Sequence, residues 1–242
     1  MPSTVWGPEI AEVYDATSAA MFDPAVLGPT VEVLYELAGR GPVLEFAVGT
    51  GRVALALAAR GVRVSGIELS PHMADQLKAK PDSDRVPVTI GDMTTTRVPG
   101  TFKLVYLVFN TIMNVTTQDE QVAVFENAAR HLEHGGRFVI EVVVPQLPMP
   151  GQPGRVFSMD KRHVGIDTHD DPVGQIASSH HWFSIQGRFV YQSGPSRYVW
   201  PSELDLMAQI AGLHLAQRWA GWDRSAFKAG STSQVAVFEK AT

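Results

Sequence analysis

The sequence contains no cysteine among its 242 residues. This absence excludes disulfide bonds, thiol nucleophiles and cysteine-based zinc sites. Runs of lysine and arginine are also missing, and the formal net charge is −5, so an extended nucleic-acid-binding surface is not expected. No apolar stretch is long enough to cross a bilayer, and the first residues lack the basic and apolar regions of a signal peptide. We therefore expect a soluble, cytoplasmic protein that binds neither a membrane nor a nucleic acid.

What remains is an ordinary globular composition, 45% hydrophobic and 19% charged. The length suits one large α/β domain with a small insertion. We expect a single domain over residues 1–242, with an N-terminal helical segment at 1–40 and an inserted antiparallel sheet at 146–200. The sequence leaves the oligomeric state open, with a homodimer among the alternatives.

Short apolar runs alternate with amphipathic helical segments through the first 145 residues. Continuous apolar strands separated by helices indicate a parallel sheet that is covered on both faces, which gives a doubly wound fold. Two further strands close to the C-terminus have no helix between them and are expected to form an antiparallel hairpin at the sheet edge. The sequence thus predicts a mostly parallel seven-stranded sheet, with strands at residues 43–47, 63–67, 86–90, 102–109, 138–144, 213–222 and 234–239.

The pattern changes after Pro145, where a loop rich in proline and glycine extends to Gly154. From Val156 to Tyr198 the residues are strand-like, with turn signals and no helical periodicity. This segment predicts a small antiparallel sheet inserted into the main fold. The loop before it is interpreted either as a lid or as a passive linker.

The stretch VLEFAVGTGRVALALAARG combines a strand, a glycine-rich turn and a helix. Gly49 and Gly51 allow close approach of a ligand to the backbone, and the helix that starts near Arg52 directs N–H groups at it. Glu68 ends the second strand, where a carboxylate can accept both hydroxyls of a ribose. Asp92 ends the third strand, where it can accept a hydrogen bond from an adenine amino group. The pattern predicts a site for an adenosine-containing cofactor.

Two adenosine cofactors fit the glycine pattern alone. Residues 49–54 satisfy the dinucleotide motif G-x-G-x-x-G/A, so an NAD-dependent oxidoreductase is one alternative. Glu45, however, precedes the turn and would repel a pyrophosphate, whereas it would attract a cation. Three acids around one cleft favour S-adenosylmethionine, which carries a sulfonium, an amino group and a ribose. A non-catalytic protein that binds S-adenosylmethionine is the second alternative.

The segments VLEFAVGTG, GIELS and GDM, in this order and spacing, resemble the class I S-adenosylmethionine-dependent methyltransferases. The resemblance implies that the first acid and the glycine loop hold the methionine part, and that the later acids hold the ribose and adenine. Ala47 stands where the family usually has its first glycine. The cofactor-binding residues implied in this way are Glu45, Ala47, Gly49, Gly51, Glu68, Leu69, Asp92, Met93, Phe109 and Asn110.

The chain more closely resembles the bacterial amino-sugar N-methyltransferases. This resemblance is in the segment EIAEVYD, the GDM motif and the stranded insertion. It implies that Tyr14 closes over the cofactor and contacts the substrate. Asn114 occupies the place where some members have a catalytic histidine. This difference argues against a sugar substrate and against base catalysis from this position. We expect methyl transfer to a nitrogen or oxygen of a small molecule in bacterial secondary metabolism.

A methyl acceptor that carries a proton needs a base, and three residues are candidates. Glu141 lies inside an apolar strand, either as a paired structural carboxylate or as a substrate-facing base. His180 and His181 are adjacent, so in a strand at most one faces a cleft, and a structural role is the alternative for each. His163 and His169 are expected at the surface. The histidine spacings match no common metal-ligand set, so no metal is expected.

The insertion is rich in aromatic residues, which either form its core or line an apolar substrate pocket. Under the second interpretation the substrate-binding residues, together with Tyr14 and Asn114, are Trp182, Tyr198 and Trp200, with Tyr191 as a further aromatic of the same group.

Overall fold

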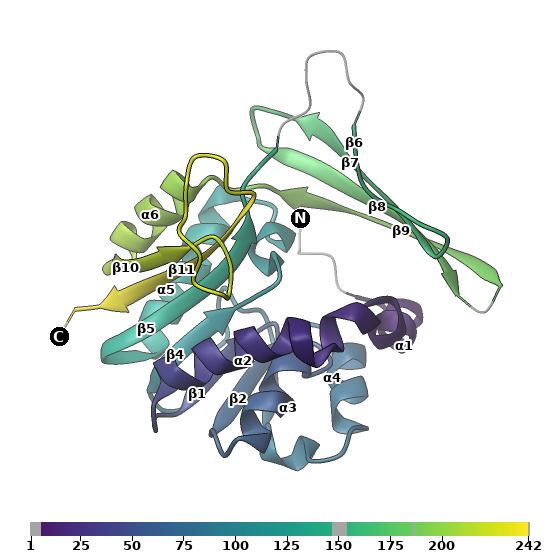
Figure 1. Ribbon diagram of the computed structural model, residues 1–242. Coiled ribbons are helices and arrows are strands. Elements are labelled where there is room, and N and C mark those ends of the chain that lie inside the picture. Colours follow the sequence, from purple (N-terminus) through teal and green to yellow (C-terminus); the bar gives the residue numbers. More distant parts are fainter. Residues whose placement is uncertain (1–5, 147–153, 186, 242) are drawn as a thin grey trace.

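The computed structural model describes residues 6–146, 154–185 and 187–241. Its main element is a seven-stranded sheet of order β10-β11-β5-β4-β1-β2-β3 (Figure 1). Strands β1 to β5 run parallel, and β11 is antiparallel to both β5 and β10. The predicted fold class, with its C-terminal hairpin, is confirmed. The strands are β1 (Val43–Phe46), β2 (Val64–Glu68), β3 (Val88–Ile90), β4 (Phe102–Leu107), β5 (Leu132–Val143), β10 (Leu213–Trp219) and β11 (Ser233–Lys240).

Helices cover both faces of this sheet. Ser70 and Thr117 cap α4 and α5 by accepting backbone N–H groups with their side chains, as their sequence context predicts. No helix in the described part of the chain is long and apolar enough to span a membrane. The helices are α1 (Pro8–Thr17), η1 (Ala19–Phe22), α2 (Pro24–Ala38), α3 (Arg52–Ala59), α4 (Pro71–Lys78), η2 (Ser83–Arg85), η3 (Thr111–Asn114), α5 (Gln118–His131) and α6 (Pro201–Ile210).

Two apolar cores lie on opposite faces of the sheet. Leu34 of α2 and Leu57 of α3 pack with one set of strand residues, and Phe125 of α5 and Met207 of α6 pack with the alternate set. Successive side chains of a strand point to opposite faces, so the continuous apolar runs of β1 and β4 supply both cores. This burial fixes the sheet and aligns the carboxyl ends of β1 to β4 along one edge.

Several strand boundaries differ from the sequence prediction, and the starts of β5 and β3 have an identifiable cause. β5 begins at Leu132 and not at residue 138. Pairing of Leu132 with Phe102 of β4 extends the strand to this point. β3 begins at Val88 and not at residue 86, because the backbone N–H of Val86 closes the preceding turn on Ser83.

A second sheet, four-stranded and antiparallel, is inserted between β5 and α6. Figure 1 shows it projecting from the main sheet and extending above α1. Residues 147–153 of the predicted proline- and glycine-rich loop lie outside the described residues. The strands are β6 (Arg155–Met159), β7 (His163–Asp171), β8 (Ile176–Ile185) and β9 (Arg188–Arg197).

A buried hydrogen-bond network, which we call the Arg197 anchor, joins the second sheet to the main domain. Arg197 donates to the side chains of Gln121, Gln175 and Glu203, at 2.9 Å to each of the last two. Gln121 of α5 in turn donates to the carbonyls of Arg197 and of Ile112 in η3, each at 3.1 Å. The Arg197 side chain is 6% exposed, so its charge is compensated by buried partners and not by water. The anchor fixes the base of the second sheet against α5, α6 and η3.

Candidate active site

Strained backbone marks the carboxyl ends of β1 and β4. After β1, Ala47, Gly49 and Gly51 adopt left-handed φ angles of 52°, 57° and 82°. After β4, Phe109 and Asn110 have φ angles of 58° and 62°. Non-glycine residues in this region cost about 1–3 kcal/mol each, and such positions concentrate at functional sites. The two turns lie side by side because β1 and β4 are paired.

Glu68 connects the glycine loop to the start of α4. Its Oε2 accepts the backbone N–H of Gly49 at 2.8 Å, and its Oε1 accepts that of Ser70 at 2.8 Å. The side chain is buried, which raises its pKa, while these two donors act in the opposite direction. Each carboxylate oxygen can accept a second hydrogen bond, so the geometry leaves room for ribose hydroxyls. Leu69 follows directly and is half-buried.

Glu45 is enclosed between β1, β4 and the first turn of α3. Its Oε2 accepts the hydroxyl of Tyr106 at 2.7 Å, and the residue is 3% exposed. Burial is the main cause that raises the pKa of Glu45 to about 8, with Tyr106 and Arg52 acting in the opposite direction. Burial therefore favours the neutral carboxyl, which weakens the sequence-based expectation of a negative charge at Glu45.

Asp92 and Met93 form the turn after β3. Asp92 Oδ1 accepts both the backbone N–H and the hydroxyl of Thr94, at 2.8 and 2.7 Å. The Met93 side chain is buried, and its carbonyl accepts the Asn127 amide at 2.8 Å. Within the described residues Asp92 Oδ2 meets no donor, so an adenine amino group can reach this oxygen.

Helix α1 is fastened to the glycine loop by Asp15, which the sequence prediction missed. Asp15 Oδ1 accepts the hydroxyl of Thr50 at 2.6 Å, and its Oδ2 lies 2.5 Å from Lys80 Nζ. The preceding residue, Tyr14, packs edge-to-face on Trp6 at 5.6 Å, and burial raises its pKa. The Asp15 contacts thus hold Tyr14 beside the loop after β1.

Glu141 supports the strained turn after β4. Its Oε2 accepts the backbone N–H of Phe109 at 2.8 Å, and its Oε1 accepts the indole N–H of Trp222 at 2.8 Å. Asn110 completes the turn, with its Oδ1 accepting the N–H of Val143 at 2.7 Å. Both oxygens of Glu141 are engaged by protein donors, which favours a positioning role over that of a base. Trp222, 81 residues away in sequence, was not identified from the sequence.

The second sheet separates the two adjacent histidines. His180 contacts the hydroxyl of Tyr191 at 2.8 Å, on the face that also carries the exposed Trp182. His181 lies on the opposite face, where its Nδ1 is 3.0 Å from Nε2 of His163. His163, which the sequence analysis expects at the surface, is half-buried.

The remaining predicted residues lie around the Arg197 anchor. Tyr198 is buried and meets Trp200 edge-to-face at 6.5 Å, and Asn114 is half-buried in η3. His169, also expected at the surface, is half-buried, and its ring lies 5.7 Å from Tyr198. These side chains belong to the junction of the two sheets, whereas Trp182 points away from it.

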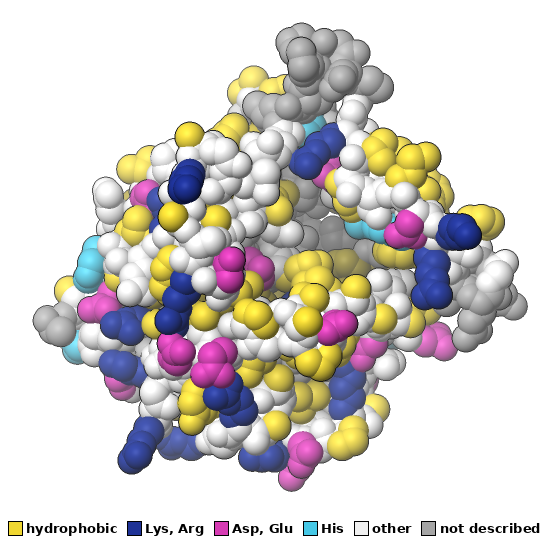
Figure 2. Space-filling view, in the orientation of Figure 1, with side chains coloured by type: hydrophobic (Ala, Val, Ile, Leu, Met, Phe, Trp, Pro, Cys, Tyr) yellow, Lys and Arg dark blue, Asp and Glu magenta, His cyan; other side chains and the backbone are white. Residues whose placement is uncertain are grey.

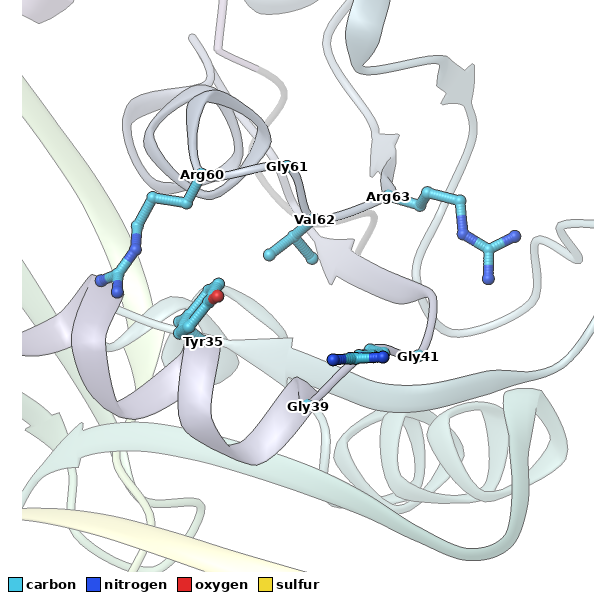
Figure 3. A pocket seen from close by; sticks show the side chains of 8 residues that line it. Tyr35, Gly39, Gly41, Arg60, Gly61, Val62 and Arg63 are labelled. Carbon is cyan, nitrogen blue, oxygen red and sulfur yellow. The ribbon is translucent and has the colours of Figure 1, made fainter.

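A separate cavity of about 160 Å³ opens near the start of β1 and β2, opposite the predicted cofactor site (Figure 3). Arg60, one of its lining residues, stacks on Tyr35 at 3.9 Å and pairs with Glu32 at 2.6 Å. The C-terminal ends of α2 and α3 border this cavity, so its backbone groups do not favour an anion. The carboxyl edge of the main sheet, by contrast, combines left-handed turns with the carboxylates of Glu68 and Asp92, the residue types that the sequence predicts for an adenosine cofactor.

Comparisons with known proteins identify the family of the chain. A family model described as a methyltransferase domain matches residues 43–136. The chain is 28% identical to the cypemycin N-terminal methyltransferase of Streptomyces sp over 98% of both chains. It is 32% identical to a dTDP-4-amino-2,3,4,6-tetradeoxy-D-glucose N,N-dimethyltransferase of Saccharopolyspora spinosa, over 57% of this chain and 56% of that one.

The structure is also similar to that of the CcbJ methyltransferase from Streptomyces caelestis, with a TM-score of 0.86, 32% identity and full coverage of both chains. The chain therefore belongs to the S-adenosylmethionine-dependent methyltransferases, and S-adenosylmethionine is its cofactor.

Proposed function

We propose that this enzyme methylates an amine nitrogen of a small molecule made in bacterial secondary metabolism. The curated relatives named above act on nitrogen, one at a peptide N-terminus and one on an amino sugar. The observation that supports the proposal most is the arrangement of the turns after β1 and β4, which lie side by side at one edge of the main sheet. The inserted sheet, which carries titratable side chains, is the second part of this arrangement. A net charge of −5 supports a small acceptor over a nucleic acid.

In this proposal the cofactor half positions a reactive methyl group. Bound S-adenosylmethionine supplies a methyl that its sulfonium already activates. Glu68 accepts ribose hydroxyls, Asp92 Oδ2 accepts the adenine amino group, and the loop from Ala47 to Gly51 contacts the methionine part. Tyr14, held by α1, closes the site and excludes water.

The acceptor half must align a nitrogen lone pair with the methyl group. We propose residues 1–242 as one domain, in which the N-terminal segment 1–40 covers the cofactor and the insertion 146–200 covers the acceptor. The Glu141-supported turn at Phe109 and Asn110 lies between them. Such alignment can lower a barrier by about 7–11 kcal/mol. Catalysis then depends on residues that position the acceptor. Glu141 suits this role, because its two oxygens accept hydrogen bonds from Phe109 and Trp222.

A product assay tests the proposal. Purified protein with S-adenosylmethionine is given short peptides with a free N-terminus, 4-aminohexoses, and matched phenols and alcohols, and products are read by mass spectrometry. We expect a mass gain of one or two methyl groups on an amine and none on the hydroxyl compounds. Methylation confined to phenols or alcohols would contradict the nitrogen acceptor, and binding of S-adenosylhomocysteine without any turnover would support a non-catalytic role.

A further inference from the structure

The second sheet has an inner and an outer face that differ in exposure. Ala177 and Ser196 are 6% and 8% exposed, whereas Phe189 and Tyr191, on the opposite face, are 84% and 55% exposed. The buried side is therefore the one directed at the main domain, and Figure 2 shows a hollow between this sheet and the helices with histidine at its border. We call this side the inner face; strand alternation and register place on it His163, Gly165, Asp167, Ala177, Ser179, His181, Phe183 and Ser196.

Two histidines on the inner face form a fixed pair. His163 Nε2 and His181 Nδ1 are 3.0 Å apart, and the ring planes differ by 9°. Phe183 stacks on His163 with centroids 4.5 Å apart, and Phe157 meets His181 edge-on at 5.3 Å. A side chain at Gly165 would place its Cβ 2.4 Å from the Phe157 ring, so this glycine permits the close packing. The aromatic neighbours hold both imidazoles in one orientation.

The surroundings of His181 favour its neutral form, in which one ring nitrogen can accept a proton. Burial, followed by the charge of His163 and more weakly by that of His180, lowers the pKa of His181, while Asp167 acts in the opposite direction. In the tautomer in which its Nδ1–H donates to His163 Nε2, its own Nε2 carries an open lone pair. Once protonated, His181 keeps this hydrogen bond, which stabilises the imidazolium.

Asp167 lies on the inner face with the histidine pair and offers a carboxylate that can bind an ammonium group. Asp167 Oδ1 accepts the hydroxyl of Ser179 at 2.6 Å, and within the described residues its Oδ2 has no donor. Asp167 is two residues from Gly165, which is directly paired with His181. An ammonium group that approaches Asp167 therefore comes close to His181 as well.

We propose that His181 is the base that removes a proton from the acceptor ammonium, that His163 positions its ring, and that Asp167 binds the ammonium. This inference rests on the proposed function and deepens it by assigning a cationic amine as substrate. The R–NH₃⁺ group gives one proton to His181 Nε2, and the freed lone pair forms the N–CH₃ bond. The S–CH₃ bond breaks with its electron pair on sulfur, leaving S-adenosylhomocysteine and R–NH₂⁺–CH₃. The imidazolium then returns its proton to solvent.

The test is a pH profile of kcat/KM from pH 6.5 to 9 for the His181→Gln variant. The acceptor is a free-N-terminus peptide that the wild-type enzyme methylates. Its α-amine has a pKa near 7.9, so about 4% is neutral at pH 6.5 and most is neutral at pH 9. Without its base the variant uses only the neutral fraction, so we expect a loss of about 20-fold at pH 6.5 and a rate within about twofold of wild type at pH 9. His163→Gln is expected to lose less and to recover over the same range.

His180→Gln is the matched control, because this residue is adjacent in sequence but lies on the outer face. We expect its profile to follow the wild type, and all variants to keep the wild-type affinity for S-adenosylhomocysteine. Asp167→Asn is expected to raise KM for the peptide while kcat changes little. An unchanged His181→Gln profile, or a loss that is equal at every pH, would show that the pair only packs the sheet. A wild type that methylates no amine would instead refute the proposed function itself.

Discussion

Glu45 provides a quantitative prediction about stability and pH. Its pKa is about 8 in the folded protein, against an ordinary value of 4.5. Each pH unit between these values corresponds to about 1.4 kcal/mol, so the whole interval is worth about 5 kcal/mol. Because the folded-state pKa is raised, this contribution to stability is fully present below pH 4.5 and is lost as the pH rises through 8. Replacing Glu45 with Gln removes the titration and keeps an acceptor for the Tyr106 hydroxyl.

The assay is urea unfolding of the wild type and of Glu45→Gln at several values between pH 5 and 8.5. We expect the free energy of unfolding of the wild type to fall, relative to the variant, by about 1.4 kcal/mol per pH unit up to pH 8 and then to level off. Glu12→Gln, at an exposed position of α1, serves as the control and should run parallel to the wild type. A constant difference between wild type and Glu45→Gln across this range would show that Glu45 ionises normally, and the reasoning from its burial would fail.

Three further predictions concern the turns and the cofactor. Ala47→Gly should raise the free energy of unfolding by about 1 kcal/mol in urea titrations, because the left-handed φ of 52° penalises a Cβ; a decrease would contradict this strain. Glu68→Ala should weaken S-adenosylhomocysteine binding by about 10- to 100-fold in calorimetry, since a charged acceptor contributes about 1.5–3 kcal/mol, and an unchanged affinity would place the cofactor elsewhere. Glu141→Gln should lower kcat about tenfold without altering the shape of the pH profile, because one of its two donors loses an acceptor; a lost acidic limb would identify Glu141 as a base.

The grouping of the candidate cofactor residues at one sheet edge could be predicted because its signals are local. The carboxyl ends of parallel strands share one edge, so Glu68 at the end of β2, Asp92 in the turn after β3 and the glycines after β1 come together. Hydrophobic alternation and turn residues likewise sufficed to predict the insertion as an antiparallel sheet. Neither inference needed any knowledge of side-chain packing.

The contacts that join distant segments could not be predicted in this way. His163 meets His181 only because the β7–β8 register pairs Gly165 with His181, and no single-sequence pattern fixes that register. Asp15 reaches Thr50 across 35 residues, through the packing of α1 on the glycine loop. The left-handed φ of Ala47 was equally hidden, because alanine gives no sign of such a conformation.

The Arg197 anchor has a consequence for how enzymes of this type diversify. The second sheet enters and leaves the fold within one connection, between β5 and α6, and the buried arginine fixes its base. Substitutions along β6 to β9 can therefore accumulate without disturbing Glu68 or the glycine loop, which lie on other strands. Under the proposed function, changes confined to this one insertion would alter the acceptor and leave the cofactor-binding residues intact. A laboratory graft of a relative's insertion would use the same boundaries and exchange the chain between β5 and α6.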